Sequence, residues 1–449
     1  MFPASSPDDL DANLEHLGRS FINKCSFAND TSIDYAQFRG TPNEDRFAIS
    51  EDWKLHGHIW QFLAVFDGHG GSTTAEYLAK HFPSNLRRSM ERSFSSSPES
   101  GIPPPSSASQ SSAVPLTAKN VSEFLKREVR WFDEELGHAV KTICPHPENI
   151  SDDKEAHALY EAHKEVIARA RCGSTMAGIL VDKTENKMWV CCVGDSSVVL
   201  STKASTGRKR TTVLVNDHHT GRTPQEYHRV SMAHPSLERD NIWLDGEDRI
   251  FGTLSMTRAF GDFMFKFPTS FTTALFSKFP SSAMRSVETV LRYNRTPPYV
   301  ISDPSVKYVD LTTFSKDVDP VVVIYTDGLE TLANGLSMSL KKSVPDATSG
   351  TLNVLPTAVD IIGALLGQHP DLSMSSISLS VENLPENNAA FNLMYELLRR
   401  TISGKLRSHL MAVDNAVSPS ISDEDLYIDD ITVIVFRPIS NQPLNAVYV

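Results

Sequence analysis

Short runs of apolar, mostly β-branched residues recur along the chain, and each run ends at Asp, Gly or Ser. Runs of this length and composition are typical of buried strands. The sequence predicts strands over Leu63–Phe66, Met176–Val181, Met188–Val193, Val321–Tyr325 and Ile431–Phe436. Between the runs, apolar residues return at the spacing of a helix face. Such spacing predicts helices over Asp153–Ala170 and Phe391–Leu406.

A further helix is predicted to begin at Thr73. Thr73 and Glu76 match the capping-box pattern, in which each side chain satisfies the other residue's backbone N–H. Ala75, Leu78 and Phe82 then fall on one face of that helix. Helices do not alternate regularly with single strands, and no Gly-rich phosphate loop follows the first strand. The pattern therefore favours an α+β fold over a doubly wound α/β sheet.

Composition narrows the classes of protein. The chain has 449 residues, of which 40% are hydrophobic and 22% charged, so it can bury a substantial core. A net charge of -12 argues against nucleic acid or an anionic membrane as the main partner, because both reward clustered Lys and Arg. No apolar stretch approaches the roughly 18 residues of a membrane span. Five cysteines without a C-x-x-C pair indicate free thiols in a reducing compartment, with Cys191 and Cys192 in the core.

Acidic residues stand at the ends of several predicted strands. Asp67 follows the run Trp60–Phe66 and is itself followed by Gly-His-Gly, and the same placement recurs at Asp195, Asp327 and Asp429-Asp430. Mg²⁺ and Mn²⁺ prefer oxygen ligands and keep several waters, so carboxylates and a carbonyl suffice to bind them. One such Asp alone is typical of a turn or a cap. Four of them together indicate a metal site.

Seven motifs in a fixed order carry a family resemblance. They are Asn43-Glu44-Asp45-Arg46, Val65-Phe66-Asp67-Gly68-His69-Gly70-Gly71, Gly173-Ser174-Thr175, Val193-Gly194-Asp195-Ser196, Thr257-Arg258-Ala259-Phe260-Gly261-Asp262, Thr326-Asp327-Gly328-Leu329 and Asp429-Asp430-Ile431-Thr432-Val433. The chain resembles the metal-dependent serine/threonine protein phosphatases of the 2C type over nearly its whole length. The resemblance implies a four-layer αββα sandwich, in which two antiparallel sheets are flanked by helices.

The resemblance also implies a domain plan. We expect an N-terminal extension (1–35), a phosphatase catalytic domain (36–440) and a tail (441–449). Two insertions interrupt the domain. Residues 93–115 are rich in Ser and Pro and are expected to be disordered. Residues 264–295 hold several phenylalanines and are expected to pack as a flap that selects substrates, with a buried structural excursion as the alternative.

The resemblance assigns metal ligands. Asp67 is expected to bridge two Mg²⁺ or Mn²⁺ ions, the Gly68 carbonyl to bind one of them, and Asp327 and Asp429 to complete the other. Asp195 matches the residue that helps hold a third, weaker ion in relatives, although a hairpin turn is an equal reading. Two such ions lower the pKa of a shared water and clamp the attacking and departing oxygens, so no covalent intermediate is needed.

Other motif residues receive supporting roles. Glu44 and Asp45 match the acidic pair that orients waters, while the pair alone would be read as a solvated turn. His69 is the expected general acid for the leaving oxygen, because an imidazole pKa near 6.5 suits proton transfer at neutral pH. Within residues 257–262 we expect an internal pair between Arg258 and Asp262. His218 and His219 are expected to be structural.

The sequence departs from the family pattern at two places. The phosphate-binding arginine of relatives falls at Gly40, which leaves Arg39 and Arg46 as open candidates. Glu330 stands where the family usually has a core Trp. Several details resemble the pyruvate dehydrogenase phosphatase branch. They are Asp217-His218-His219-Thr220-Gly221-Arg222, Lys266, Thr296-Pro297-Pro298-Tyr299-Val300 with Asp303-Pro304, and Tyr427-Ile428-Asp429-Asp430.

That branch implies a phosphoprotein substrate, pyruvate dehydrogenase E1 alpha, and residence in the mitochondrial matrix. The first residues have neither a signal peptide's apolar core nor the Arg-rich, acid-poor character of a transit peptide, so a cytoplasmic location is the alternative. A catalytically weak or inactive scaffold that binds a phosphoprotein is the rival function. The retention of Asp67, Asp327, Asp429 and His69 favours an active enzyme. A metal-dependent nuclease fits the carboxylates but not the acidic charge.

Overall fold

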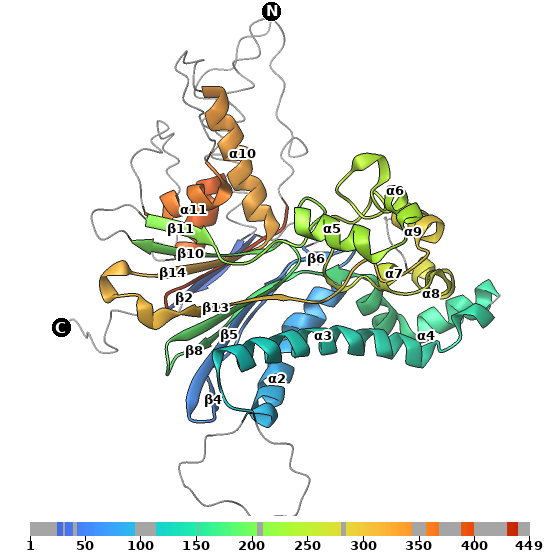
Figure 1. Cartoon of the computed structure of the whole chain (residues 1–449), viewed down its shortest axis with the longest axis horizontal. Helices are drawn as coiled ribbons and strands as arrows, with labels where there is room; N and C mark the ends of the chain where they lie inside the picture. The colour runs from blue at the N-terminus through green and yellow to red at the C-terminus, as the bar shows by residue number, and fades with distance from the viewer. Residues whose placement is uncertain are drawn as a thin grey trace, which may run out of the picture. The chain divides into compact units, whose positions relative to one another are not determined.

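The structure, a computed structural model (Figure 1), describes residues 25–29, 32–38, 43–94, 114–150, 152–203, 210–279, 284–343, 356–367, 388–398 and 429–438. The chain divides into two compact units. Unit 1 comprises Met1–Asn43, Val198–Val215 and Thr313–Val449, and unit 2 comprises Glu44–Ser197 and Asn216–Thr312.

Unit 1 is built on a six-stranded sheet. Its order is β1 (Cys25–Asn29), β2 (Ile33–Phe38), β15 (Ile431–Phe436), β14 (Val321–Tyr325), β10 (Ser197–Lys203) and β11 (Arg210–Leu214). β15 is antiparallel to both β2 and β14. Every residue of β14 and β15 is buried, which explains why both strands are almost continuously apolar.

Helices cover this sheet through one apolar cluster. The helices are α10 (Asp327–Ser343), α11 (Ala358–Leu366) and residues 389–398. Leu329 and Leu332 from α10, Ile361 from α11 and Phe391 lie in one buried cluster with residues of the sheet such as Val433. The burial of these side chains supplies most of the drive for the helices to pack there.

Unit 2 holds a second antiparallel sheet. Its order is β13 (Ser305–Asp310), β9 (Lys187–Val193), β8 (Met176–Asp182), β5 (His58–Phe66) and β3 (Arg46–Ile49), with β4 (Trp53–Leu55) also paired to β5. The helices α2 (Thr73–Ser93) and α3 (Ala118–Ile143) run along this sheet (Figure 1). Phe82 and Phe132 from these helices join Trp60, Phe62 and Trp189 from the sheet in one core.

Further helices and a small sheet complete unit 2. The helices are α4 (Asp153–Arg171), α5 (Pro224–Ala233), α6 (Arg239–Ile242), α7 (Phe263–Lys266), α8 (Thr269–Ala274) and α9 (Met284–Tyr293). A small three-stranded sheet has the order β12 (Phe260–Gly261), β7 (Gly173–Ser174) and β6 (Gly68–His69). Turns of 3₁₀ helix in unit 2 lie at Pro147–Asn149, Ser236–Glu238, Leu244–Gly246 and Phe276–Lys278. A further turn, Leu311–Thr313, lies at the boundary of the two units, and Lys316–Val318 belongs to unit 1.

The sequence-based fold predictions are largely confirmed. The α+β class, with antiparallel sheets flanked by helices, is observed, and all five predicted strands lie within β5, β8, β9, β14 and β15. The helix predicted over Asp153–Ala170 is α4. The predicted helix over Phe391–Leu406 is seen for residues 389–398, and its remainder lies outside the described residues. No helix in the described ranges is both long and apolar enough to cross a membrane.

The capping box predicted at Thr73 is wrong. α2 does begin at Thr73, and Ala75, Leu78 and Phe82 are buried as expected. The N-cap, however, is Ser72, whose backbone is already helical and whose side chain makes no capping hydrogen bond. Glu76 instead contacts Arg46 at 3.5 Å. The pair Thr73 and Glu76 thus predicted the start of the helix correctly, but it did not predict the hydrogen bonds of the first helical turn.

Both predicted insertions touch described residues. Most of 93–115 lies outside them, and an isolated bridge between Phe94 and Val114 joins the ends of the gap. In 264–295, Phe265, Phe267, Phe271 and Phe276 are buried in a single cluster. These four rings are therefore not exposed for recognition, which favours the alternative of a buried structural excursion. Residues 1–24 and 439–449, which cover most of the predicted N-terminal extension and all of the predicted tail, lie outside the described residues.

Candidate active site

The three-stranded sheet of unit 2 brings together segments from distant parts of the chain. His69 of β6 and Gly261 of β12 both pair with Gly173 in β7. A Cβ atom at Gly173 would overlap His69 Nε2 and Asp262 Oδ2. The two side chains therefore meet directly against the backbone of Gly173, and only glycine leaves room for them.

His69 and Asp262 form a short, largely buried pair. His69 Nε2 lies 2.6 Å from Asp262 Oδ2, and the Asp262 side chain is only 5% exposed. The Asp262 backbone lies in the left-handed region and its N–H donates to the Cys172 carbonyl, which fixes the carboxylate over Gly173. Burial alone would lower the pKa of His69, but the charge and hydrogen bond of Asp262 outweigh burial. With smaller effects from Asp195 and Glu44, the pKa of His69 is raised.

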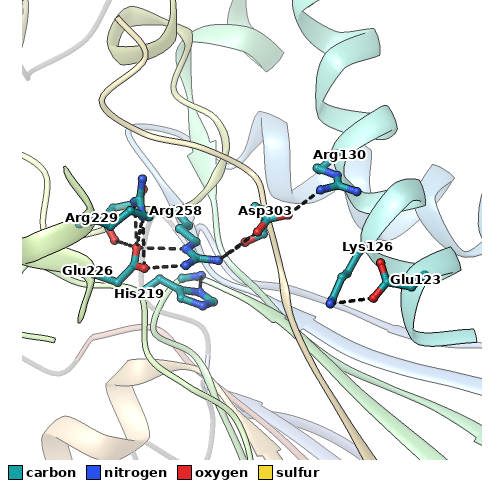
Figure 2. Close-up of polar contacts among 10 residues, drawn as sticks. Glu123, Lys126, Arg130, His219, Glu226, Arg229, Arg258 and Asp303 are labelled. Carbon is teal, nitrogen blue, oxygen red and sulfur yellow. Dashed lines mark hydrogen bonds and ion pairs between the residues drawn. The ribbon is translucent and has the colours of Figure 1, made fainter. Parts of the chain in front are cut away.

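This contact corrects the prediction that Asp262 pairs with Arg258. Figure 2 shows Arg258 between Glu226 and Asp303: it donates to Glu226 Oε1 at 2.6 Å and to the Asp303 carbonyl at 2.7 Å. Arg229 also bonds Glu226 at 2.8 Å. Burial opposes ionisation of Glu226, but hydrogen bonds from Arg258, Arg229 and Thr257 lower its pKa to about 2. The motif therefore combines one structural arginine with one aspartate at the site.

Thr175 connects Asp67 to the turn that carries Asp195. Its N–H donates to the Asp67 carbonyl at 2.9 Å, and its Oγ1 lies 2.7 Å from Ser196 Oγ. Gly194 has a positive φ of 98°, and an added Cβ there would lie 2.6 Å from Thr175 Cβ. The turn is consequently packed tightly against Thr175, with Asp195 half-buried next to it.

The two histidines after Asp217 support the same turn. The Gly194 N–H donates to His219 Nδ1 at 3.2 Å, and His218 Nε2 lies 2.8 Å from Ser197 Oγ. Burial, reinforced by the charge of Arg258, lowers the pKa of His219 to about 3, so this ring is a neutral acceptor. Their expected structural role agrees with these contacts.

The acidic pair Glu44 and Asp45 is not a solvated turn. Asp45 is 1% exposed and Glu44 is half-buried. A Cβ at Gly68 would come within 2.5 Å of the Glu44 carbonyl oxygen, so glycine permits the close approach of the two segments. Arg46 donates to the Asp45 carbonyl at 2.7 Å as well as contacting Glu76. Arg39, the other candidate for phosphate, lies outside the described residues.

In unit 1, Asp327 and Asp429 come from neighbouring strand ends. Asp327 follows β14 and opens α10, while Asp429 and Asp430 precede β15, which pairs with β14. The Thr432 N–H donates to Thr326 Oγ1 at 2.9 Å, and an added Cβ at Gly328 would overlap the Asp430 carbonyl oxygen. Glu330, at the family's Trp position, is half-buried on the same helix.

The predicted site residues thus form two sets. Unit 2 carries Glu44, Asp45, Asp67, Gly68, His69 and Asp195, and unit 1 carries Asp327 and Asp429. Within the described ranges, no group of three or more His, Cys, Asp or Glu side chains is arranged to hold a metal ion. The donors offered in each unit are nonetheless carboxylate and carbonyl oxygens, the chemistry that Mg²⁺ and Mn²⁺ prefer.

Sequence reasoning missed Asp262 as the partner of His69, Thr175 as the link to Asp195, and Arg171 and Cys172 beside the site. Cys172 Sγ donates to the Gly70 carbonyl at 3.0 Å, and burial raises the pKa of this thiol to about 11. Cys144, Cys191 and Cys192 are also free and buried, as predicted. The motif Gly173-Ser174-Thr175 was a signal of close packing that the sequence already contained.

Comparisons with known proteins find similarity to protein phosphatases 2C. A profile of the family described as Protein phosphatase 2C matches residues 132–333. A protein phosphatase 2C homologue of Schizosaccharomyces pombe is 25% identical over 96% of this chain and 85% of its own length. The crystal structure of a serine-threonine phosphatase 2C from Toxoplasma gondii covers 92% of this chain and 98% of its own, with 14% identity and a TM-score of 0.41.

Two mitochondrial pyruvate dehydrogenase phosphatases are also similar. The human protein is 26% identical over 61% of this chain, and the Saccharomyces cerevisiae protein is 26% identical over 86%. The matched regions span 49% and 63% of those two proteins. The family profile, the curated relatives and the ordered motifs thus all show similarity to the protein phosphatase 2C family of serine/threonine protein phosphatases.

Proposed function

We propose that the protein hydrolyses phosphoserine and phosphothreonine in proteins, with Mg²⁺ or Mn²⁺ as cofactor. The observation that carries the proposal is the contact between His69 and Asp262 directly beside Asp67 and Gly68. A histidine with a raised pKa, held by a carboxylate, keeps a proton available near neutral pH. An alkoxide leaving group needs such a proton.

The carboxylate and carbonyl oxygens of the candidate residues are of the kind that divalent cations prefer. Asp67, the Gly68 carbonyl, Asp327 and Asp429 would hold two ions, and Asp195 would help to hold a third, weaker one. Gly68 packs so closely against Glu44 that an added Cβ would clash with the Glu44 carbonyl. When bound, the ions supply an activated water and neutralise charge on the phosphoryl oxygens.

The protein's own residues do the remaining work. Thr175 fixes the backbone of Asp67 and the turn of Asp195 through its hydrogen bonds to Asp67 and Ser196. Glu44 lies beside Gly68, and Glu44 and Asp45 would orient waters. His69 donates a proton to the leaving oxygen of the seryl or threonyl side chain, and Asp262 holds the imidazole and stabilises its charged form.

We extend the proposal to the substrate. Two similar proteins are named as pyruvate dehydrogenase phosphatases of mitochondria, which supports the phosphorylated E1 alpha subunit of pyruvate dehydrogenase as substrate and the mitochondrial matrix as location. The motif details shared with that branch, such as Asp217-His218-His219, support the same assignment.

Phosphate release from peptides tests the proposal. The purified chain should dephosphorylate phosphoserine and phosphothreonine peptides, lose activity in EDTA and regain it when Mn²⁺ or Mg²⁺ is restored. A phosphopeptide from E1 alpha should be preferred over one of shuffled sequence. Phosphate release that persists in EDTA would contradict the metal dependence, and equal rates on the two peptides would remove the substrate assignment alone.

A further inference from the structure

Arg171 is a cation that the protein buries almost completely. It is the last residue of α4 and is 5% exposed. Its Nε and Nη2 atoms are buried and make no hydrogen bond within the part of the chain that the structure describes. An ionised group held out of water without acceptors is costly, so such a group is retained where a ligand or another charge completes it.

Arg171 lies at the candidate active site. It stands two residues before Gly173, against which the side chains of His69 and Asp262 pack. Its Nη1 atom is 3.5 Å from the point where a Cβ of Gly70 would be, and Gly70 directly follows His69. The Gly70 carbonyl in turn accepts a hydrogen bond from Cys172. The guanidinium therefore lies against the loop between β6 and α2.

The nearby carboxylate of Asp262 does not supply the missing hydrogen-bond acceptors of the Arg171 guanidinium. Asp262 is the carboxylate whose charge acts on Arg171, but its Oδ2 atom is engaged by His69 at 2.6 Å. Burial lowers the pKa of Arg171, and Asp262 only partly offsets that effect. The Nε and Nη2 donors of the planar guanidinium thus lack an acceptor among the described residues.

Arg169 provides the contrast within the same helix turn. Its guanidinium lies 4.3 Å from the centroid of the Tyr77 ring, and its Nε donates to the Glu165 carbonyl at 3.1 Å. A positive charge is favourable at the C-terminus of a helix, and Arg169 already supplies one for α4. Arg171 is buried instead, on the side where β7 meets the loop after His69.

We propose that Arg171 binds the phosphoryl group of the substrate and of the product phosphate. The proposal rests on the proposed phosphatase function and names a residue for the role left open by Gly40. A guanidinium donates two parallel hydrogen bonds to phosphate oxygens, which supplies both the missing acceptors and a fixed orientation. The neighbouring first turn of α2, tied to α4 by the hydrogen bond from Thr74 Oγ1 to the Arg169 carbonyl at 3.0 Å, adds a favourable dipole.

The rival role is a structural counter-charge for Asp262, and Arg171→Lys separates the two. Lysine keeps the charge but loses the bidentate geometry. Arg171→Lys should raise KM for a phosphopeptide and the inhibition constant of inorganic phosphate by about 10- to 100-fold, the loss expected for a charged hydrogen-bonded contact. Its melting temperature without phosphate should stay close to that of the unaltered chain. Arg169→Lys should leave both constants unchanged.

Binding of inorganic phosphate gives a readout without turnover. In the presence of Mn²⁺, phosphate should raise the melting temperature of the unaltered chain and of Arg169→Lys, and much less that of Arg171→Lys. An unchanged inhibition constant and an unchanged phosphate-dependent shift in Arg171→Lys would overturn the proposal. If the variant does not fold, a crystal structure of the unaltered chain with Mn²⁺ and phosphate decides instead. A phosphate oxygen about 3 Å from Arg171 is expected, and a phosphate bound away from it refutes the assignment.

The outcomes for the two proposals are distinct. An unaltered chain that releases no phosphate from any phosphopeptide contradicts the proposed function. An active unaltered chain with unaffected phosphate binding in Arg171→Lys contradicts only the role of Arg171.

Discussion

His69 Nε2 and Asp262 Oδ2 lie 2.6 Å apart although 193 residues separate them along the chain. Asp262 counteracts the burial of His69 and raises the pKa of the imidazole. Asp262→Asn should remove this effect, so the pKa of His69 should fall and its protonated form should be lost at lower pH. The alkaline limb of the kcat profile on a phosphoserine peptide should then move to lower pH. An unmoved limb, in a variant with normal stability, would show that the pair does not set the proton donor.

His69→Gln should distinguish a proton donor from a supporting residue. General acid catalysis typically contributes about 10²- to 10⁴-fold. The variant should lose activity on phosphoserine far more than on p-nitrophenyl phosphate, whose leaving group needs little protonation. The ratio of the two kcat/KM values is the measurement. Equal losses on both substrates would mean that His69 only supports the site.

Thr175 and Ser196 should be energetically coupled. Both are almost completely buried, and their hydroxyl oxygens lie 2.7 Å apart. Thr175→Val should lower the free energy of unfolding by about 1–3 kcal/mol, because it leaves Ser196 Oγ buried without this partner. Adding Ser196→Ala should cost less than the sum of the single changes. Ser84→Ala, which removes an exposed hydroxyl, is the control, and strict additivity would contradict the coupling.

Glu226 should contribute stability that depends on pH. Its pKa is about 2 in the folded protein, below the ordinary value of 4.5, so its contribution is complete above about pH 4.5 and is lost as the pH falls towards 2. The size is roughly 3 kcal/mol. Denaturant unfolding of Glu226→Gln should show its largest deficit at pH 7 and a shrinking one towards pH 3. A deficit that does not change with pH would refute the ionised network with Arg258 and Arg229.

The strands could be predicted because their composition signals them directly. β14 and β15 are runs of β-branched residues that each end in an aromatic residue, and the predicted bounds Val321–Tyr325 and Ile431–Phe436 match the structure. The helix of α4 was likewise visible in its apolar spacing. In these elements, burial of one continuous face decides the structure, and the sequence records that burial position by position.

The contacts of the site could not be predicted in the same way. β6, β7 and β12 have two residues each, too few for any periodic pattern, yet they place His69 over Gly173 and beside Asp262. Proximity in sequence suggested Arg258 as the partner of Asp262. The structure instead turns Asp262 towards the site through its left-handed backbone, while Arg258 points to Glu226. Long-range pairing determines both choices.

Metal-dependent hydrolysis of phosphoserine and phosphothreonine is tested most directly on one phosphothreonine peptide. The unaltered chain and Asp67→Asn are each assayed on this peptide with Mn²⁺ and with EDTA. Phosphate release is expected only from the unaltered chain with Mn²⁺. Asp67→Asn is expected to be inactive while its circular dichroism spectrum is unchanged. Near-normal phosphate release by folded Asp67→Asn, or full activity of the unaltered chain in EDTA, would contradict the account.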